Sequence, residues 1–288
     1  MIISASRRSD IPAFYSAWFM EQLRRGEVVV KNPFRPAQEK RVSLKKQDVD
    51  AFVFWSRDPR PFMGYLPEIE RGGYPYYFLI TVTGYPRLLE PCTPRIEKAV
   101  IFFEKLAGRI GRRRLIWRYD PVIFTDGTAF DFHVNNFSNL VRLLSPFISR
   151  VIVSFFDPYP KVNRRLRKTG IAVEKAAGSP EQQTDLLARF TAVADRSGLE
   201  IQSCAEAALT AGVPLGGCAR PPVGLGGYAR PPVGPGKCVD EELLNELFGL
   251  GLPYRKDPAQ RKLCLCQQSV DIGSYGTCRH GCLYCYAR

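Results

Sequence analysis

Short apolar runs rich in β-branched and aromatic residues recur along this chain of 288 residues. They lie at residues 1–4, 28–31, 52–55, 76–82, 115–119, 151–155 and 199–203, with a weaker run at 269–272. Between many of them, apolar side chains recur with the spacing of one helix face, as in 96–107, 137–148 and 186–194. Strands and helices that alternate this often predict an α/β fold with a parallel sheet, either open or closed into a barrel.

Polar side chains gather directly after these runs, and this placement favours the closed form. They are Arg7, Arg8 and Asp10; Asn32; Ser56 and Arg57; Thr81 and Thr83; Arg118 and Asp120; Ser154 and Asp157; and Cys204 and Glu206. In a (β/α)8 barrel the carboxyl ends of the strands meet on one face, where ligands bind. Any one of these residues could instead cap a helix. Because the placement recurs, we predict a TIM-like (β/α) barrel whose body spans residues 1–212.

The most specific motif is a C-x3-C-x2-C run formed by Cys278, Cys282 and Cys285. Three thiolates at this spacing can hold three irons of a 4Fe–4S cluster and leave the fourth iron open. An open iron is what a cluster needs to bind S-adenosylmethionine and to start radical chemistry. Zinc is the alternative, with His280 as a fourth ligand, but zinc sites usually contain paired cysteines. The spacing therefore favours an iron–sulfur cluster.

Four further cysteines, Cys204, Cys238, Cys264 and Cys266, form a second candidate ligand set. Residues two apart in an extended segment point the same way, so Cys264 and Cys266 can bind one metal. Four thiolates make a closed site, and the alternatives are an auxiliary 4Fe–4S cluster, structural zinc or unligated buried thiols. The auxiliary cluster is the favoured reading. Cys92, between two prolines, is predicted to be a plain core or loop thiol.

Residues 213–239 are rich in Gly and Pro and contain a ten-residue tandem repeat, at 216–225 and 226–235. The repeat is too short and too rich in turn formers to pack as a domain, so it predicts a flexible insertion. Cys218 and Cys238 occupy equivalent positions, and Cys238 is the better ligand because a helical stretch follows it directly. Residues 240–288 then form a Cys-rich segment that completes the barrel and carries the cluster loop.

The formal net charge of +13 at pH 7 is compatible with a polyanionic partner such as nucleic acid or with a solvated basic surface. No run of about 18 apolar residues appears, so no membrane partner is expected. The N-terminal sequence lacks the pattern of a signal peptide. A cytoplasmic location follows as an expectation, and cysteines in a reducing compartment serve as metal ligands rather than disulfides.

Arg7, Arg8 and Asp10 are the best candidates for holding an anionic group, because guanidinium suits carboxylate and phosphate. A surface salt bridge is the alternative role for these residues. Only two histidines exist, which argues against His-based catalysis. Further candidate binding residues on the same predicted rim are Arg57, Arg118, Asp120 and Glu206.

Several segments together resemble a known family. They are IISASRRSDIPAFY, FVFWSRDP, WRYDPVIF, SCAE and QRKLCLCQQSVDIGSYGTCRHGCLYCYA. With them the chain resembles the bacterial domain-of-unknown-function family 1848 over nearly its whole length. Its cysteine run, including the aromatic Tyr284, is similar to the cluster loop of radical S-adenosylmethionine enzymes. In those enzymes the loop lies near the N-terminus, so its place after the last strand here implies a circularly permuted barrel.

The resemblance implies an iron–sulfur enzyme of radical S-adenosylmethionine type. It implies that Tyr284 packs near the adenine of the cofactor and that a reducing electron donor is a partner. The substrate, a small molecule or a nucleic acid, stays open. The alternative is a non-enzymatic iron–sulfur or zinc protein that binds nucleic acid, and a third possibility is a simple electron carrier.

Overall fold

The computed structural model describes residues 1–33, 35–204 and 233–288. Its main sheet has eight parallel strands in the order β10-β1-β4-β5-β6-β7-β8-β9. The strands are β1 (Ile2–Ala5), β4 (Ala51–Ser56), β5 (Tyr76–Thr81), β6 (Leu115–Val122), β7 (Arg150–Phe155), β8 (Glu200–Ser203), β9 (Gly234–Pro235) and β10 (Val270–Asp271). The predicted α/β fold with a large parallel sheet is confirmed. In the described ranges no pairing joins β9 to β10, so closure into a barrel stays a prediction.

The last strand of this sheet lies beside the first. Ile3 of β1 is in register with Val270 of β10, and Ser4 is in register with Asp271. On its other side β1 pairs with β4. The segments that follow β1 and β10 therefore leave the sheet next to each other, although more than 250 residues separate Ser4 from Asp271 in the chain.

Both faces of the main sheet are buried, because alternate residues of its strands enter different apolar clusters. Phe54, Phe78 and Trp117 belong to the larger cluster, which is shared with the surrounding helices. Val53 and Leu79, from the intervening positions, belong to a second cluster on the opposite face. Burial of both faces is typical of parallel sheets and explains why the strands read as continuous apolar runs.

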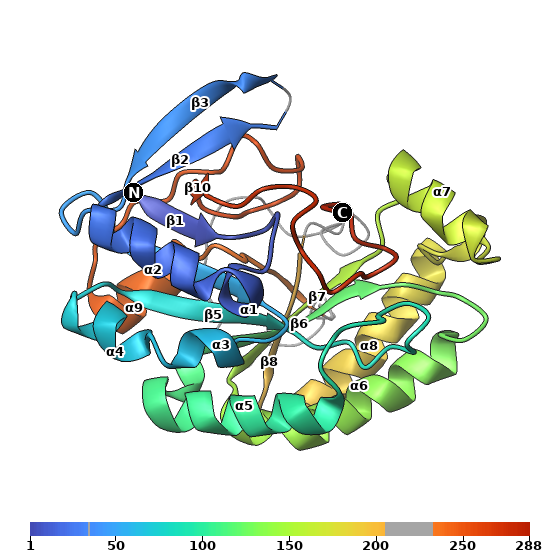
Figure 1. The fold of residues 1–288 in the computed structure, drawn as a ribbon. Helices are drawn as coiled ribbons and strands as arrows, with labels where there is room; N and C mark the ends of the chain where they lie inside the picture. The colour runs from blue at the N-terminus through green and yellow to red at the C-terminus, as the bar shows by residue number, and fades with distance from the viewer. Residues whose placement is uncertain (34, 205–232) are drawn as a thin grey trace.

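Helices connect the strands and cover the sheet, and α5, α6 and α8 lie together along one side of it (Figure 1). The helices are α1 (Ile11–Phe14), α2 (Ser16–Arg25), α3 (Arg60–Met63), α4 (Leu66–Arg71), α5 (Ile96–Ile110), α6 (Phe130–Leu144), α7 (Pro160–Lys168), α8 (Pro180–Arg196) and α9 (Glu241–Phe248). Short 3-10 turns occur at Arg112–Arg114, Ser145–Phe147 and Val173–Lys175. Leu243 and Leu244 of α9 pack into the second cluster, on the face that the other helices leave open.

Side-chain caps fix where several helices begin. Ser179 and Gln182 form a capping box at the start of α8, in which each side chain bonds the backbone of the other residue. The Asp240 carboxylate accepts from the Leu243 backbone N–H at the start of α9. Gly249 ends α9 in the left-handed region at φ 65°, which a glycine adopts without steric cost.

One predicted strand lies outside the main sheet. The run at 28–31 forms β2 (Glu27–Asn32), which pairs antiparallel with β3 (Arg35–Ser43) in a separate hairpin. Val28 is buried, whereas Val29 is 42% exposed, so only one face of this hairpin packs on the protein. The sequence of β3 is polar and does not predict a strand. The segment is extended because it pairs with β2, and it does not need the apolar side chains that a buried strand requires.

Part of the predicted Gly/Pro-rich insertion belongs to the sheet. Residues 233–239 contain β9, and Val233 and Cys238 are buried. The rest of the insertion up to residue 232, with Cys218, lies outside the described residues, as does Glu206. No helix in the described ranges combines the length and the apolar character that a bilayer span requires.

Candidate metal centre

The cysteine loop 278–285 follows β10 and is held by backbone bonds to the segment after β5. The Leu283 N–H donates to the Leu89 carbonyl at 2.9 Å, and the Cys92 N–H donates to the His280 carbonyl at 3.2 Å. Gly281 lies between these anchors at φ 74°, and a Cβ there would approach Pro91 to 3.1 Å. The backbone conformation therefore favours glycine at this position.

The sulfurs of Cys278, Cys282 and Cys285 interact electrostatically with one another. Cys282 is buried, while Cys278 and Cys285 are partly exposed. The backbone N–H groups of His280 and Asp10 donate to the Cys278 sulfur, and such bonds favour its thiolate. The pKa of Cys282 is raised to about 12, chiefly by burial; the Arg57 charge opposes this rise and nearby Glu90 adds to it.

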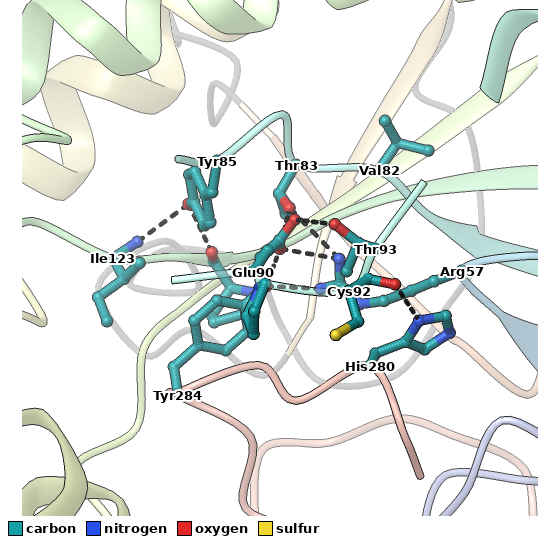
Figure 2. Close-up of polar contacts among 12 residues, drawn as sticks. Arg57, Val82, Thr83, Tyr85, Glu90, Cys92, Thr93, Ile123, His280 and Tyr284 are labelled. Carbon is teal, nitrogen blue, oxygen red and sulfur yellow. Dashed lines mark hydrogen bonds and ion pairs between the residues drawn. The ribbon is translucent and has the colours of Figure 1, made fainter. Parts of the chain in front are cut away.

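A buried carboxylate, Glu90, lies beside the loop and has four hydrogen-bond or ion-pair partners around it (Figure 2). Arg57 Nη1 lies 2.8 Å from Glu90 Oε1, and Thr93 Oγ1 donates to Glu90 Oε2 at 3.2 Å. The hydroxyls of Thr83 and Tyr284 also donate to Glu90. Arg57 in turn donates to the Tyr284 hydroxyl at 2.6 Å, so the charge pair is satisfied inside the protein.

The hydrogen bonds around Glu90 fix the positions of two predicted site residues, Arg57 and Tyr284. Arg57 lies close enough to the cysteine loop for Cys282 and Cys285 to raise its pKa, together with Glu90, against the effect of burial. Tyr284 is 6% exposed, and its ring packs edge-on against Tyr85 at 5.9 Å. Tyr284 thus anchors the loop through its hydroxyl, and its expected contact with adenine stays a prediction.

Asp10 is a second buried anchor for the loop. Its carboxylate caps α1 through the Ala13 N–H at 2.9 Å and accepts from Ser56 Oγ at 2.8 Å and from the Arg57 N–H at 2.7 Å. His280 Nε2 lies 2.8 Å from Asp10 Oδ2. Since the other ring nitrogen of His280 faces the Cys92 carbonyl at 3.3 Å, both nitrogens are engaged away from the sulfurs.

The predicted anion-binding residues separate into two places. Arg8 lies 3.9 Å from the Asp271 carboxylate and 5.4 Å from the Tyr275 ring centroid. Arg7 instead pairs with Asp257 at 3.2 Å and lies 5.3 Å from the Trp55 ring centroid. Sequence reasoning missed Asp257 and Asp271, which carry no motif of their own.

Arg118 approaches the same Trp55 ring, at 4.8 Å from its centroid. It pairs with Asp120, which also accepts from the Ser154 hydroxyl. Three donor atoms around this ring are buried without a hydrogen-bond partner, namely Arg7 Nη2, Trp55 Nε1 and Arg118 Nε. An anionic group would satisfy such donors.

The second cysteine set comes together from three segments. Cys204 follows β8, Cys238 follows β9, and Cys264 and Cys266 precede β10. The Cys238 and Cys204 sulfurs are 3.9 Å apart. Side-chain hydrogen bonds also link Cys204 to Cys264, Cys238 to Cys266, and Cys264 to Cys266. All four belong to the apolar cluster that contains Trp55.

Among the described residues, no three His, Cys, Asp or Glu side chains already have their donor atoms arranged around a metal position. The two cysteine groups are therefore sets of thiols that the fold has gathered. The sequence predicted which cysteines form each of the two groups. Nothing in the sequence indicated that Glu90 would be buried, because it lies in a loop of ordinary composition.

Comparison with known proteins places the chain in one family. It matches the family described as "Domain of unknown function (DUF1848)" over residues 2–287, and it belongs to that family, as the sequence predicted. No curated protein matches the chain.

Proposed function

We propose that this member of the DUF1848 family is an iron–sulfur enzyme of radical S-adenosylmethionine type. The observation that carries the proposal is the loop of Cys278, Cys282 and Cys285. It brings three thiols from one short segment to the carboxyl-end side of a parallel sheet, where ligands of α/β proteins bind. Three thiolates would hold a 4Fe–4S cluster with one open iron, and the cluster would supply one-electron cleavage of S-adenosylmethionine.

The residues around the loop fit a cluster in two respects. N–H groups of His280 and Asp10 donate to the Cys278 sulfur, and hydrogen bonds of this kind tune iron–sulfur centres. Arg57 contributes a buried positive charge beside Cys282 and Cys285, which would offset the negative charge of thiolate ligands. Since the free thiol of Cys282 has a raised pKa, cluster binding must release its proton.

The remaining site residues bind and position. Glu90 and Asp10 fix Arg57, Tyr284 and His280, and through them the loop. Arg7 and Arg118 would hold an anionic part of the substrate or the carboxylate of the cofactor, because donor atoms of both are buried without partners. We place an anionic substrate between these arginines and the loop, and an external reductant supplies the electron.

The proposed function includes a closed barrel fold and a cytoplasmic location. We propose that the sheet, in which β10 lies beside β1, closes into a (β/α) barrel that is permuted so that the cluster loop follows the last strand. We propose that β9 and β10 lie at the seam of that barrel. A cytoplasmic, reducing setting suits a cluster bound by thiolates.

Anaerobic purification with iron, sulfide and zinc analysis tests this function. We expect a cluster of about four irons with matching sulfide that the Cys282→Ser variant loses. Cys92→Ser is the matched control, because Cys92 is an exposed thiol outside both cysteine sets. The paramagnetic resonance signal of the reduced protein should change when S-adenosylmethionine is added. Zinc without iron would exclude the proposed mechanism, and so would a paramagnetic resonance signal that does not change when S-adenosylmethionine is added.

A further inference from the structure

We infer that Cys204, Cys238, Cys264 and Cys266 form a closed four-thiolate site for a single zinc ion, which joins the two edges of the main sheet. This inference is independent of the proposed radical chemistry, because it concerns the other set of thiols. It also replaces the auxiliary 4Fe–4S cluster that the sequence favoured.

The spacing of the sulfurs carries the inference. Tetrahedral zinc with Zn–S bonds of about 2.3 Å holds its sulfurs roughly 3.8 Å apart. The Cys204 and Cys238 sulfurs are 3.9 Å apart, and hydrogen bonds connect all four side chains in a ring. In a 4Fe–4S cluster each thiolate binds its own iron and inorganic sulfide fills the space between them, so cysteine sulfurs do not touch.

The surroundings of the four thiols indicate a structural site rather than a catalytic one. The exposed fractions of Cys204, Cys238, Cys264 and Cys266 are 6%, 2%, 4% and 2%. Leu243 of α9 packs in the same apolar cluster. Four buried protein ligands leave no open position for water or substrate, which is the arrangement of structural zinc.

Donors around the sulfurs fit the negative charge of a zinc tetrathiolate. The backbone N–H of Val239 donates to the Cys266 sulfur, and that of Cys266 donates to the Cys264 sulfur. Arg261 Nη2 lies 3.9 Å from the Cys204 sulfur. The buried Arg7 guanidinium is a further positive charge that interacts with the Cys266 sulfur. These contacts would orient and stabilise thiolate ligands.

The position of the site indicates a structural role for the ion at the two edges of the main sheet. Strand pairing does not join β9 to β10 in the described residues, yet Cys238 lies just after β9 while Cys264 and Cys266 lie just before β10. One backbone bond already crosses between these segments, from the Gln267 N–H to the Val239 carbonyl at 2.9 Å. A zinc ion held by all three segments would fasten the sheet where the strand ladder is interrupted.

Zinc analysis and X-ray absorption on the full chain test the inference. We expect one zinc per chain, with four sulfur neighbours at about 2.3 Å. Zinc should remain in Cys282→Ser and Cys92→Ser and be lost in Cys264→Ser and Cys266→Ser. The loss should lower Tm by at least about 5 °C. If the last two variants fail to fold, the absorption spectrum of the unaltered protein still decides.

Two results would overturn the inference. The first is about eight irons with matching sulfide and no zinc, with about half of the iron lost in Cys264→Ser. The second is protein with no metal at these thiols after purification and zinc addition. Zinc without any iron, lost in Cys264→Ser but kept in Cys282→Ser, would instead support this site and exclude the proposed radical chemistry, so the two proposals fail separately.

Discussion

The two cysteine groups of this protein differ in how many chain segments supply them and in whether their sulfurs contact one another. The loop group, Cys278, Cys282 and Cys285, comes from one segment, and its sulfurs influence each other through charge. The four-thiol group comes from three segments, and its sulfurs touch. Sulfurs held apart leave room for a large cofactor between them, whereas sulfurs in contact leave room only for a single small ion. The difference teaches that contact between sulfurs, more than cysteine count, indicates the kind of metal.

The charges beside the two groups differ as well. Arg57 beside the loop is locked by Glu90 and Tyr284, so its position is fixed by a network that includes no cysteine. Arg7 beside the four-thiol group is bonded through one nitrogen to Asp257, while its Nη2 has no hydrogen-bond partner. The first arginine therefore supports the loop, and the second retains a donor for a ligand.

Replacing one cysteine in each group should give the largest difference in stability between the two groups. We expect Cys266→Ser to lower the free energy of unfolding by about 4 kcal/mol, because it removes an ion that binds only the folded chain. In protein that contains zinc but no iron–sulfur cluster, Cys285→Ser should cost about 1 kcal/mol, because its loop lies outside the strand ladder. Anaerobic denaturant titration measures both. Equal losses would contradict the division into a structural and a functional group.

Glu90→Gln should weaken the support of the loop without touching a sulfur. The variant leaves the Arg57 charge buried without its counter-charge, so we expect a loss of about 3 kcal/mol and lower iron loading. Glu97→Gln, at an exposed position of α5, is the control and should change stability by less than about 0.5 kcal/mol. Unfolding curves and iron analysis report the outcome. Unchanged iron in Glu90→Gln would show that the loop needs no such support.

Acid should destabilise the fold even without metal, through His133. Burial lowers the pKa of this imidazole to about 4, whereas the unfolded chain titrates near 6.5. Between these values the unfolded state binds the extra proton, so stability falls as the pH drops through the window, by about 2 kcal/mol at pH 5. Denaturant titration at pH 7 and pH 5 on metal-free protein measures this. A His133→Gln variant with the same pH slope would refute the assignment.

The smallest effect is expected at an exposed ion pair of α9. Arg113 and Glu246 pair at 2.6 Å, but their side chains are 56% and 61% exposed. Because water screens such pairs, Glu246→Gln should cost less than about 0.5 kcal/mol and leave zinc unchanged. Thermal unfolding with zinc analysis checks this. A larger loss would mean that the pair, rather than the buried thiols, holds α9 to the sheet.

Much of the fold followed from periodicity, and the exceptions have physical causes. The runs at 52–55, 76–82 and 115–119 became central strands because burial on both faces demands continuous apolar sequence. The strand β3 is polar, and β9 consists of Gly234 and Pro235, so neither has a pattern that periodicity can detect. Pairing partners, which are a property of the whole fold, define both.

The sites were predictable to the extent that they depend on residue type. The cysteine pattern predicted which thiols the fold brings together in two groups, and strand ends indicated Arg7, Arg57 and Arg118. Spacing did not reveal that Arg57 would be paired with Glu90, because a single Glu in a loop looks the same whether it is buried or solvated. It also did not reveal that the four thiols of the second group would be linked by hydrogen bonds, since that depends on how three distant segments converge.

The pairing of β10 with β1 has a consequence for biogenesis. The ribosome makes β1 before the other strands of the main sheet, but its partner β10 and the two cysteine-bearing segments 264–266 and 278–285 emerge after β8 and α9. Neither ligand group is complete while the earlier strands are being synthesised. If the two groups bind metals as proposed, metal insertion would be a late event, and newly made protein without its metals would expose the edges of the sheet to other chains.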